Sequence, residues 1–152
     1  RNPLVDRWVY KKRTASGLTI ILPKDAVKAS LKCLKNRGII GMMVDQSLST
    51  GGVFVDFFGR PASSTTLPAL LHIRTGAPVM FAYLLRNRDR FRLVFEPVTF
   101  PPVADPAERI QVYTQVMSTQ FEQVIRRYPE NWLWLHNRWK RQPETIQDSR
   151  PL

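Results

Sequence analysis

Hydrophobic residues recur along this chain at two spacings, one typical of helices and the other of buried strands. The clearest helical spacing lies in residues 24–36, where Val27, Leu31 and Leu34 stand three and four positions apart. The same spacing predicts three further helices, over residues 3–13, 67–74 and 107–128. Glycine or proline follows each of these helices, which is typical of helix ends; these residues are Gly17, Gly38, Gly76 and Pro129.

Short runs of apolar, often β-branched residues predict buried strands between the helices. These runs cover residues 18–22, 38–44, 78–85 and 91–96. The order strand, helix, strand is the βαβ pattern, so we expect residues 38–44 and 78–85 to be parallel neighbours. The polar turn at residues 86–90 predicts an antiparallel hairpin at the sheet edge. The predicted fold class is α/β, with a mixed, mainly parallel sheet flanked by helices.

A polar loop follows the strand predicted at residues 38–44, and it begins with an acid and an amide, Asp45 and Gln46. An acid at the C-terminal end of a buried strand lies where α/β sheets place ligands. Asp is also a common turn residue, so a purely structural cap remains open. Residues 53–59 then predict a hydrophobic, hairpin-like segment, and the hydroxyl residues at 63–66 offer N-caps for the next helix.

The length of 152 residues and the hydrophobic content of 43% predict one ordinary domain with a real core. We expect this domain to cover residues 1–140, followed by a polar tail over residues 141–152. The single cysteine, Cys33, excludes an internal disulfide and is compatible with a reducing compartment. No apolar run approaches the roughly 18 residues of a membrane span. Because the sequence begins at Arg1 rather than Met, we interpret it as a piece of a longer chain.

A net charge of +11 and a pI near 10.5 predict an anionic partner. Nucleic acid, a phospholipid surface and an acidic protein all carry suitable charge. A nucleic-acid-binding module would interleave stacking aromatics with cations on one surface. In this chain the cations are dispersed and most aromatics fall at core-periodic positions, so we predict no nucleic-acid partner. That module and a non-catalytic structural fragment remain the alternative functions.

The chain lacks several well-known catalytic and binding motifs. One cysteine and two distant histidines, His72 and His136, do not predict a metal site, and no cofactor is predicted. The phosphate-binding Gly-x4-Gly-Lys-Ser/Thr motif and the nucleophile motif Gly-x-Ser-x-Gly are both absent from the sequence. His72 lies in a predicted helix, where a histidine is more typically structural than a base.

Four spaced motifs nevertheless occur together in a characteristic order. They are Asp45-Gln46, Gly-Gly-Val-Phe-Val-Asp-Phe-Phe-Gly at residues 51–59, Thr-Gly-Ala-Pro-Val at 75–79 and Pro-Glu-Asn-Trp-Leu-Trp-Leu-His-Asn-Arg-Trp-Lys at 129–140. This set resembles the lipid A biosynthesis late acyltransferases, the lauroyl/myristoyl transferases of Gram-negative bacteria. Asn2-Pro3 and Asp6 resemble the Asn-Pro-x-x-Asp segment of that family. The resemblance extends from about Asn2 to Lys140.

The resemblance implies a glycerolipid acyltransferase-like fold and the transfer of a fatty acyl group to a hydroxyl of a lipid A precursor or related glycolipid. The donor is expected to be a thioester of acyl carrier protein or coenzyme A, and the location the cytoplasmic face of the bacterial inner membrane. The family uses a His-x4-Asp/Glu dyad as its base. Here Ala77 stands five residues after His72, and Arg141 stands five after His136. The resemblance therefore implies that the dyad, the N-terminal elements of the fold and a membrane anchor precede Arg1, and we expect this chain alone to be inactive.

The resemblance also implies roles for individual residues. The expected substrate-binding residues are Asp45, Gln46, Phe57, Phe58, Arg60, Arg74 and Arg86. Asp45 is expected to position cations or acceptor hydroxyls and the arginines to bind anionic groups, with a solvated surface as their alternative. Phe57 and Phe58 would wall the acyl chain or serve in the core.

The last motif supplies a second expected contact. The residues expected at the membrane or the acceptor are His136, Arg138, Trp139 and Lys140. For Trp132 and Trp134 we predict packing under the sheet instead. The partners implied are the acyl thioester, an anionic glycolipid and a membrane surface. An exposed sheet edge could also support a dimer.

Overall fold

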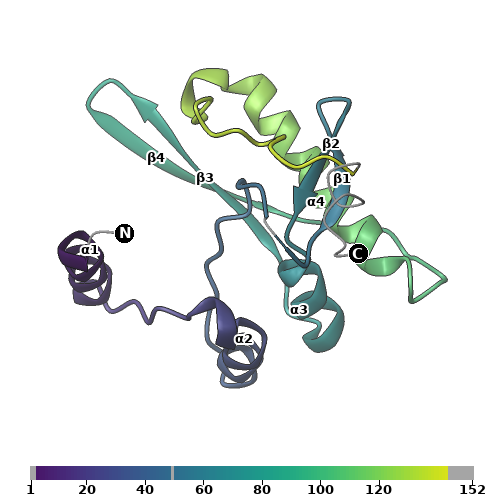
Figure 1. The fold of residues 1–152 in the computed structure, drawn as a ribbon, viewed down its shortest axis with the longest axis horizontal. Coiled ribbons are helices and arrows are strands. Elements are labelled where there is room, and N and C mark those ends of the chain that lie inside the picture. The colour runs from purple at the N-terminus through teal and green to yellow at the C-terminus, as the bar shows by residue number, and fades with distance from the viewer. Residues whose placement is uncertain (1–2, 49, 144–152) are drawn as a thin grey trace, which may run out of the picture. The chain divides into compact units, whose positions relative to one another are not determined.

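The computed structural model describes residues 3–48 and 50–143, which form two compact units that divide between Ile40 and Gly41 (Figure 1). Arg1, Asn2 and residues 144–152 of the expected polar tail lie outside the described residues. A single domain over residues 1–140 stays a prediction.

The first unit is helical. It contains α1 (Pro3–Ala15), the short 3₁₀ helix η1 (Pro23–Asp25) and α2 (Ala26–Lys35). The helices predicted at residues 3–13 and 24–36 are therefore confirmed. Residues 18–22 form no strand, and Leu18 and Leu22 are 61% and 53% exposed. That prediction was wrong because an apolar run becomes a strand only where a neighbouring backbone pairs with it, and no described strand pairs with this one.

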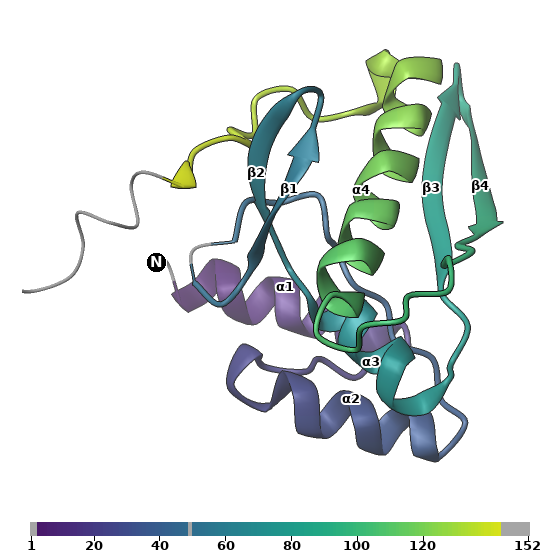
Figure 2. The same ribbon diagram turned by 90° about the vertical axis from the view of Figure 1, so that its right-hand side faces the viewer.

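The second unit places one long helix between two hairpins (Figure 2). Its elements are β1 (Val53–Phe57), β2 (Arg60–Ser64), α3 (Leu67–Thr75), β3 (Met80–Asn87), β4 (Arg90–Pro97), α4 (Arg109–Arg127) and the 3₁₀ helix η2 (Pro129–Asn131). The helices predicted at residues 67–74 and 107–128 and the hairpin around residues 86–90 are confirmed. Gly76 ends α3 in the left-handed conformation, with φ of 68°.

Within the described ranges, both sheets are antiparallel and two-stranded: β1 pairs with β2, and β3 pairs with β4. Residues 38–44 form no strand, and Ile39 and Met43 are 95% and 75% exposed. The mixed α/β class is confirmed, whereas the mainly parallel sheet and the pairing of residues 38–44 with 78–85 are not observed. Each described strand pairs with its neighbour in sequence, which leaves residues 38–44 without a partner strand.

The core of the second unit surrounds the ring of Phe57, which has no exposed surface. Ala62 and Ile125 are buried beside it, and four further aromatic residues pack around them: Phe58, Phe121, Trp132 and Trp139. The Phe57 ring centroid lies 5.7 Å from that of Phe121 and 5.6 Å from that of Trp139. Aromatic pairs at these distances stabilise a fold beyond their simple burial.

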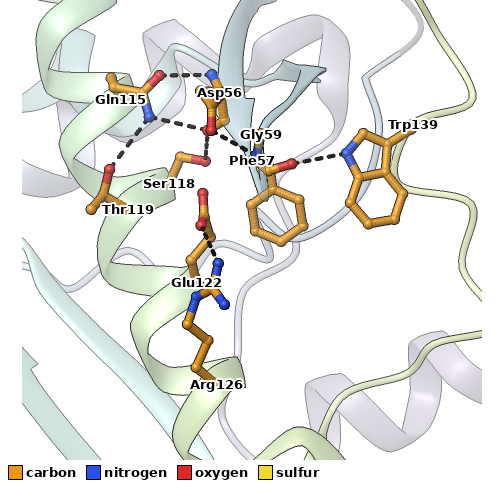
Figure 3. A network of polar contacts seen from close by, with 9 residues as sticks. All are labelled: Asp56, Phe57, Gly59, Gln115, Ser118, Thr119, Glu122, Arg126 and Trp139. Carbon is orange, nitrogen blue, oxygen red and sulfur yellow. Dashed lines mark hydrogen bonds and ion pairs between the residues drawn. The ribbon is translucent and has the colours of Figure 1, made fainter.

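Side chains of α4 close the free edge of β1 (Figure 3). The backbone N–H of Asp56 donates to Gln115 Oε1 at 2.8 Å, and Gln115 Nε2 donates to the carbonyl of Asp56 at 3.0 Å. Ser118 Oγ donates to the same carbonyl at 3.0 Å, and Gln111 Nε2 donates to the carbonyl of Phe54 at 2.7 Å. An open strand edge invites pairing with another chain. Here amide side chains take the place of a neighbouring strand.

The β3–β4 hairpin has one packed face and one exposed face. On the packed face, Phe81 lies 5.7 Å from Phe121 and Tyr83 lies 6.2 Å from Tyr128, both measured between ring centroids. The other face carries five apolar side chains that are at least half exposed: Met80, Leu84, Phe91, Leu93 and Phe95. Among the described residues, no helix is long and apolar enough to cross a bilayer.

Candidate functional site

The loop that begins at Asp45 is held against the end of β2. The backbone N–H of Leu48 donates to the carbonyl of Ser63 at 3.4 Å, and Ser63 Oγ donates to the carbonyl of Leu48 at 2.9 Å. Ser63 is buried, whereas Asp45 is half-buried and Gln46 is exposed. The loop is therefore fixed on one side and open to solvent on the other.

His136 holds the same loop from the Trp-rich segment. The backbone N–H of Ser47 donates to His136 Nε2 at 3.1 Å. This bond assigns the ring proton to Nδ1, because Nε2 must carry a lone pair to accept it. The His136 side chain is half-buried, and it joins two segments that stand 89 positions apart in the sequence.

Arg138 is the most deeply buried charge in the described residues, with 2% of its surface exposed. Its guanidinium donates to the carbonyl of Ser63 and to Ser64 Oγ, and its Cζ lies 5.4 Å from the Phe57 ring centroid. Burial lowers the pKa of Arg138 from its usual value, and the Asp45 carboxylate acts in the opposite direction. Arg138 remains charged under ordinary conditions and ties the Asp45 loop, β2 and the core together.

A small cavity of about 20 Å³ lies beside Arg138. Its lining combines hydroxyl groups with apolar side chains and consists of Val44, Ser64, Thr65, Thr114, Met117, Ser118, Phe121 and Arg138. A cavity of this size accepts a water molecule but not an acyl chain. The cavity beside Arg138 is therefore too small to be an acyl-chain site.

The structure separates the other expected substrate-binding residues into several places. Phe57 is the centre of the core, and Phe58 is half-buried in the β1–β2 turn. Arg60 is exposed, with its Cζ 5.2 Å from the Trp139 ring centroid. Arg74 is exposed in the last turn of α3.

At the end of β3, Arg86 is exposed, and its backbone N–H donates to Asn131 Oδ1 at 3.0 Å. Within the last motif, Trp139 Nε1 donates to the carbonyl of Phe57 at 3.1 Å, while Lys140 is exposed. Trp132 packs against the core as predicted. Packing of Trp134 under the sheet was a wrong prediction, because its side chain is 56% exposed.

The residues that sequence reasoning missed are the serines that connect these groups. Ser63 and Ser64 were predicted as helix caps, but both lie in β2 and are buried. The signal in the sequence was the position of these two hydroxyls a few residues after the apolar segment at residues 53–58, because a polar group buried beside apolar residues requires a partner. That partner is Arg138, 74 positions beyond Ser64.

Neither described histidine lies in a catalytic dyad. His72 Nδ1 lies 2.8 Å from the carbonyl oxygen of Ala77, to which it donates, and the His72 ring centroid is 4.6 Å from that of Phe100. No group of three His, Cys, Asp or Glu side chains in residues 3–48 and 50–143 is arranged to hold a metal ion.

Comparison with known proteins places these features in a family. A family model described as bacterial lipid A biosynthesis acyltransferase matches residues 1–141. The chain is 26% identical to the lipid A biosynthesis lauroyltransferase of Escherichia coli (strain K12) over 149 residues, which are 95% of this chain and 47% of that protein. The chain thus spans about half the length of that relative.

Two mycobacterial proteins show similar levels of identity. A phosphatidylinositol mannoside acyltransferase of Mycobacterium tuberculosis (strain ATCC 25618 / H37Rv) is 26% identical over 106 residues, which cover 70% of this chain and 32% of that protein. The protein of the same name from Mycolicibacterium smegmatis (strain ATCC 700084 / mc(2)155) is 28% identical over 100 residues, covering 66% and 32% respectively. Because the family model matches nearly the whole chain, this protein belongs to the bacterial lipid A biosynthesis acyltransferase family.

Proposed function

We propose that this chain is the substrate-holding part of an enzyme that transfers a fatty acyl group from an acyl thioester to a hydroxyl of an anionic glycolipid. The acceptor is a lipid A precursor or a related glycolipid, in keeping with the names of the relatives. The observation that carries the proposal is the meeting of two family motifs. The Asp45 loop contacts the 129–140 motif through the Ser47–His136 bond and lies within electrostatic range of Arg138.

In this reaction the acceptor oxygen attacks the carbonyl carbon of the thioester while a base takes the hydroxyl proton, and the thiol leaves. The base needs a free lone pair directed at the acceptor. The Nε2 lone pair of His136 is occupied by the N–H of Ser47, and His72 packs against Phe100 and Tyr113. We therefore propose that a His-x4-Asp/Glu dyad outside this chain supplies the base.

The role proposed for the Asp45 loop is to hold the acceptor. Gln46 is exposed and offers both a donor and an acceptor to sugar hydroxyls. The Asp45 carboxylate accepts a hydrogen bond from an acceptor hydroxyl, and the buried Arg138 guanidinium lies within electrostatic range behind it. The loop cannot shift far without breaking its bonds to Ser63 and His136. Acyl carrier protein or coenzyme A as the donor carrier, and the cytoplasmic face of the inner membrane as the location, belong to the same proposal.

Binding of the acceptor tests the role of the loop. The 152-residue chain is titrated with a lipid A precursor in detergent micelles, and Asp45→Asn is expected to weaken binding about tenfold, the effect of one charged hydrogen bond. Asp25→Asn, in the helical first unit, is the matched control and is expected to bind normally. Equal binding by Asp45→Asn and the unaltered chain would rule out an acceptor contact at Asp45.

Turnover tests the absence of the base. The unaltered chain, mixed with an acyl thioester and the lipid A precursor, is expected to form no acylated product above the blank. Product formation at the rate of an intact relative, abolished by His136→Ala, would show that this chain contains its own base.

A further inference from the structure

Three ends of secondary structure in the second unit lie on the same side: the β1–β2 turn, the C-terminal end of α4 and the β3–β4 turn. Figures 1 and 2 show all three ends at the top of the view, with the end of α4 between the two hairpin turns. Direct contacts connect them. The Cζ of Arg126 on α4 lies 4.7 Å from the ring centroid of Phe58 in the β1–β2 turn, and the N–H of Arg86 on β3 donates to Asn131 of η2.

An exposed apolar loop projects from this side, directly after η2. Leu133, Trp134 and Leu135 are 63%, 56% and 93% exposed. Trp134 Nε1 donates to the carbonyl of Pro129 at 2.7 Å, and the N–H of His136 donates to the carbonyl of Leu133 at 3.1 Å. These bonds fix the conformation of the loop, in which the leucine side chains are exposed to solvent. Consecutive exposed apolar side chains of this size indicate a contact surface.

Exposed cations lie on the segments that form this side. Arg60 begins β2, Arg126 lies in the last turn of α4, and Arg86, Arg88 and Arg90 lie at the β3–β4 turn, while exposed Lys140 follows the apolar loop in the sequence. The acids on the same segments are fewer: Asp89 is exposed in the β3–β4 turn, and three others are engaged within the protein. Asp56 accepts the N–H of Gly59 at 3.1 Å, Glu122 lies 3.8 Å from Arg126, and Glu130 accepts a bond from Asn131.

We infer that this end of the second unit is a docking face for an anionic phospholipid bilayer. In this arrangement the leucines enter the acyl region of the bilayer and the arginines bind lipid phosphate groups. Trp134 lies at the level of the headgroups, and its indole N–H donates to the carbonyl of Pro129. Charge complementarity selects an anionic partner. The aliphatic leucines favour a bilayer over nucleic acid, because a bilayer offers them an apolar phase, whereas single-stranded bases stack on aromatic side chains. An acidic protein would match the charges, but it offers no fluid apolar phase for Leu135.

This inference deepens the proposed function, because the docking face adjoins the Asp45 loop. Leu135 directly precedes His136, whose ring accepts the N–H of Ser47. A bilayer in contact with Leu135 therefore lies one residue along the chain from His136, the side chain that holds the Asp45 loop. An acceptor glycolipid could meet Asp45 and Gln46 while its acyl chains stay in the membrane.

Insertion is tested with a fluorescent label. In a Cys33→Ser background, Leu135→Cys carries an environment-sensitive NBD group, and the full chain is mixed with vesicles of phosphatidylcholine and phosphatidylglycerol. We expect a blue shift and brighter emission at this position. Ala104→Cys, exposed in the loop before α4, is the matched label position and is expected to remain unchanged. A label at position 135 that does not respond, or that responds no more than at 104, would overturn the inference.

Sedimentation with the same vesicles tests the charges. Arg88→Gln combined with Arg90→Gln is expected to weaken vesicle binding at least about tenfold, because each cation near an anionic surface contributes a several-fold effect. Lys28→Gln combined with Lys32→Gln removes the same charge from α2 and is expected to have a smaller effect. Equal losses in the two double variants would mean that net charge, not this face, drives binding.

Selectivity separates the bilayer from other anionic partners. Vesicles of pure phosphatidylcholine and a single-stranded RNA are expected to bind weakly, and Leu133→Ser with Leu135→Ser is expected to reduce vesicle binding. RNA binding that is as tight as vesicle binding would instead favour a nucleic-acid surface. Because these assays contain no glycolipid acceptor, their result is independent of the acceptor titration in detergent micelles.

Discussion

The backbone N–H of Ser47 donates a 3.1 Å hydrogen bond to Nε2 of His136, and this bond connects the Asp45 loop to the Trp-rich segment. A backbone donor gives the contact a fixed direction. It also occupies the one nitrogen of His136 that could act as a base in this tautomer. His136 is therefore positioned as a structural acceptor for the loop, and its contact with the membrane or the acceptor stays a prediction.

Loss of the His136 acceptor should loosen the Asp45 loop while leaving the core intact. His136→Ala is expected to cost about 1 kcal/mol of unfolding free energy, the usual net value of a hydrogen bond. Amide hydrogen exchange at Ser47 is expected to accelerate, whereas exchange in α4 should hardly change. Rapid exchange of Ser47 in the unaltered chain would contradict the bond. His136→Gln, which retains a side-chain acceptor, is the control and should protect Ser47 in part.

Removal of the Arg138 guanidinium should be more damaging. Arg138→Ala leaves the Ser63 carbonyl and Ser64 hydroxyl without their charged donor and opens a cavity beside Phe57, so we expect a loss of about 3 kcal/mol in urea unfolding. Arg138→Lys should recover only part of this, because an ammonium cannot reach both acceptors with the planar geometry of a guanidinium. Full recovery by lysine would show that only the charge matters.

The helices and the β3–β4 hairpin could be predicted because local information determines them. Spacing of apolar residues identified α4, and Pro129 marked its end. The strand predicted at residues 38–44 did not form, for a physical reason. Its composition fits a buried strand, but a buried strand also needs a partner strand from elsewhere in the sequence. The pairing of Arg138 with Ser63 and Ser64 is similarly non-local, and no spacing rule connects residues 74 or 75 positions apart. The Asp45 loop was found from the sequence; the contacts that support it required the structure.

The amide side chain that closes the edge of β1 gives a third prediction. Gln115→Leu leaves the N–H and carbonyl of Asp56 with fewer partners, at a cost of about 1–3 kcal/mol in unfolding free energy. Because the strand edge becomes available for pairing, the variant should also associate as its concentration rises, which analytical ultracentrifugation detects. Gln123→Leu, on an exposed part of α4, is the matched control and should leave both properties unchanged. Stable, monomeric Gln115→Leu would mean that water replaces the amide at no cost.

The hydrogen bond between Tyr83 and Glu96 gives a prediction about pH. Tyr83 Oη donates to Glu96 Oε1 at 2.7 Å, and Arg127 lies 3.3 Å from the same carboxylate. The bond to Tyr83 lowers the pKa of Glu96 below 4.5 and raises the pKa of Tyr83 above 10.0. A lowered carboxyl pKa gives stability that is present above pH 4.5 and is lost as pH falls through the folded value. A raised phenol pKa gives stability that is present below pH 10.0 and is lost as pH rises through the folded value.

Tyr83→Phe should therefore destabilise the chain most between these limits, and the difference in unfolding free energy between this variant and the unaltered chain should shrink on both sides. A difference that is constant across the whole pH range would show that Tyr83 contributes through ring packing alone.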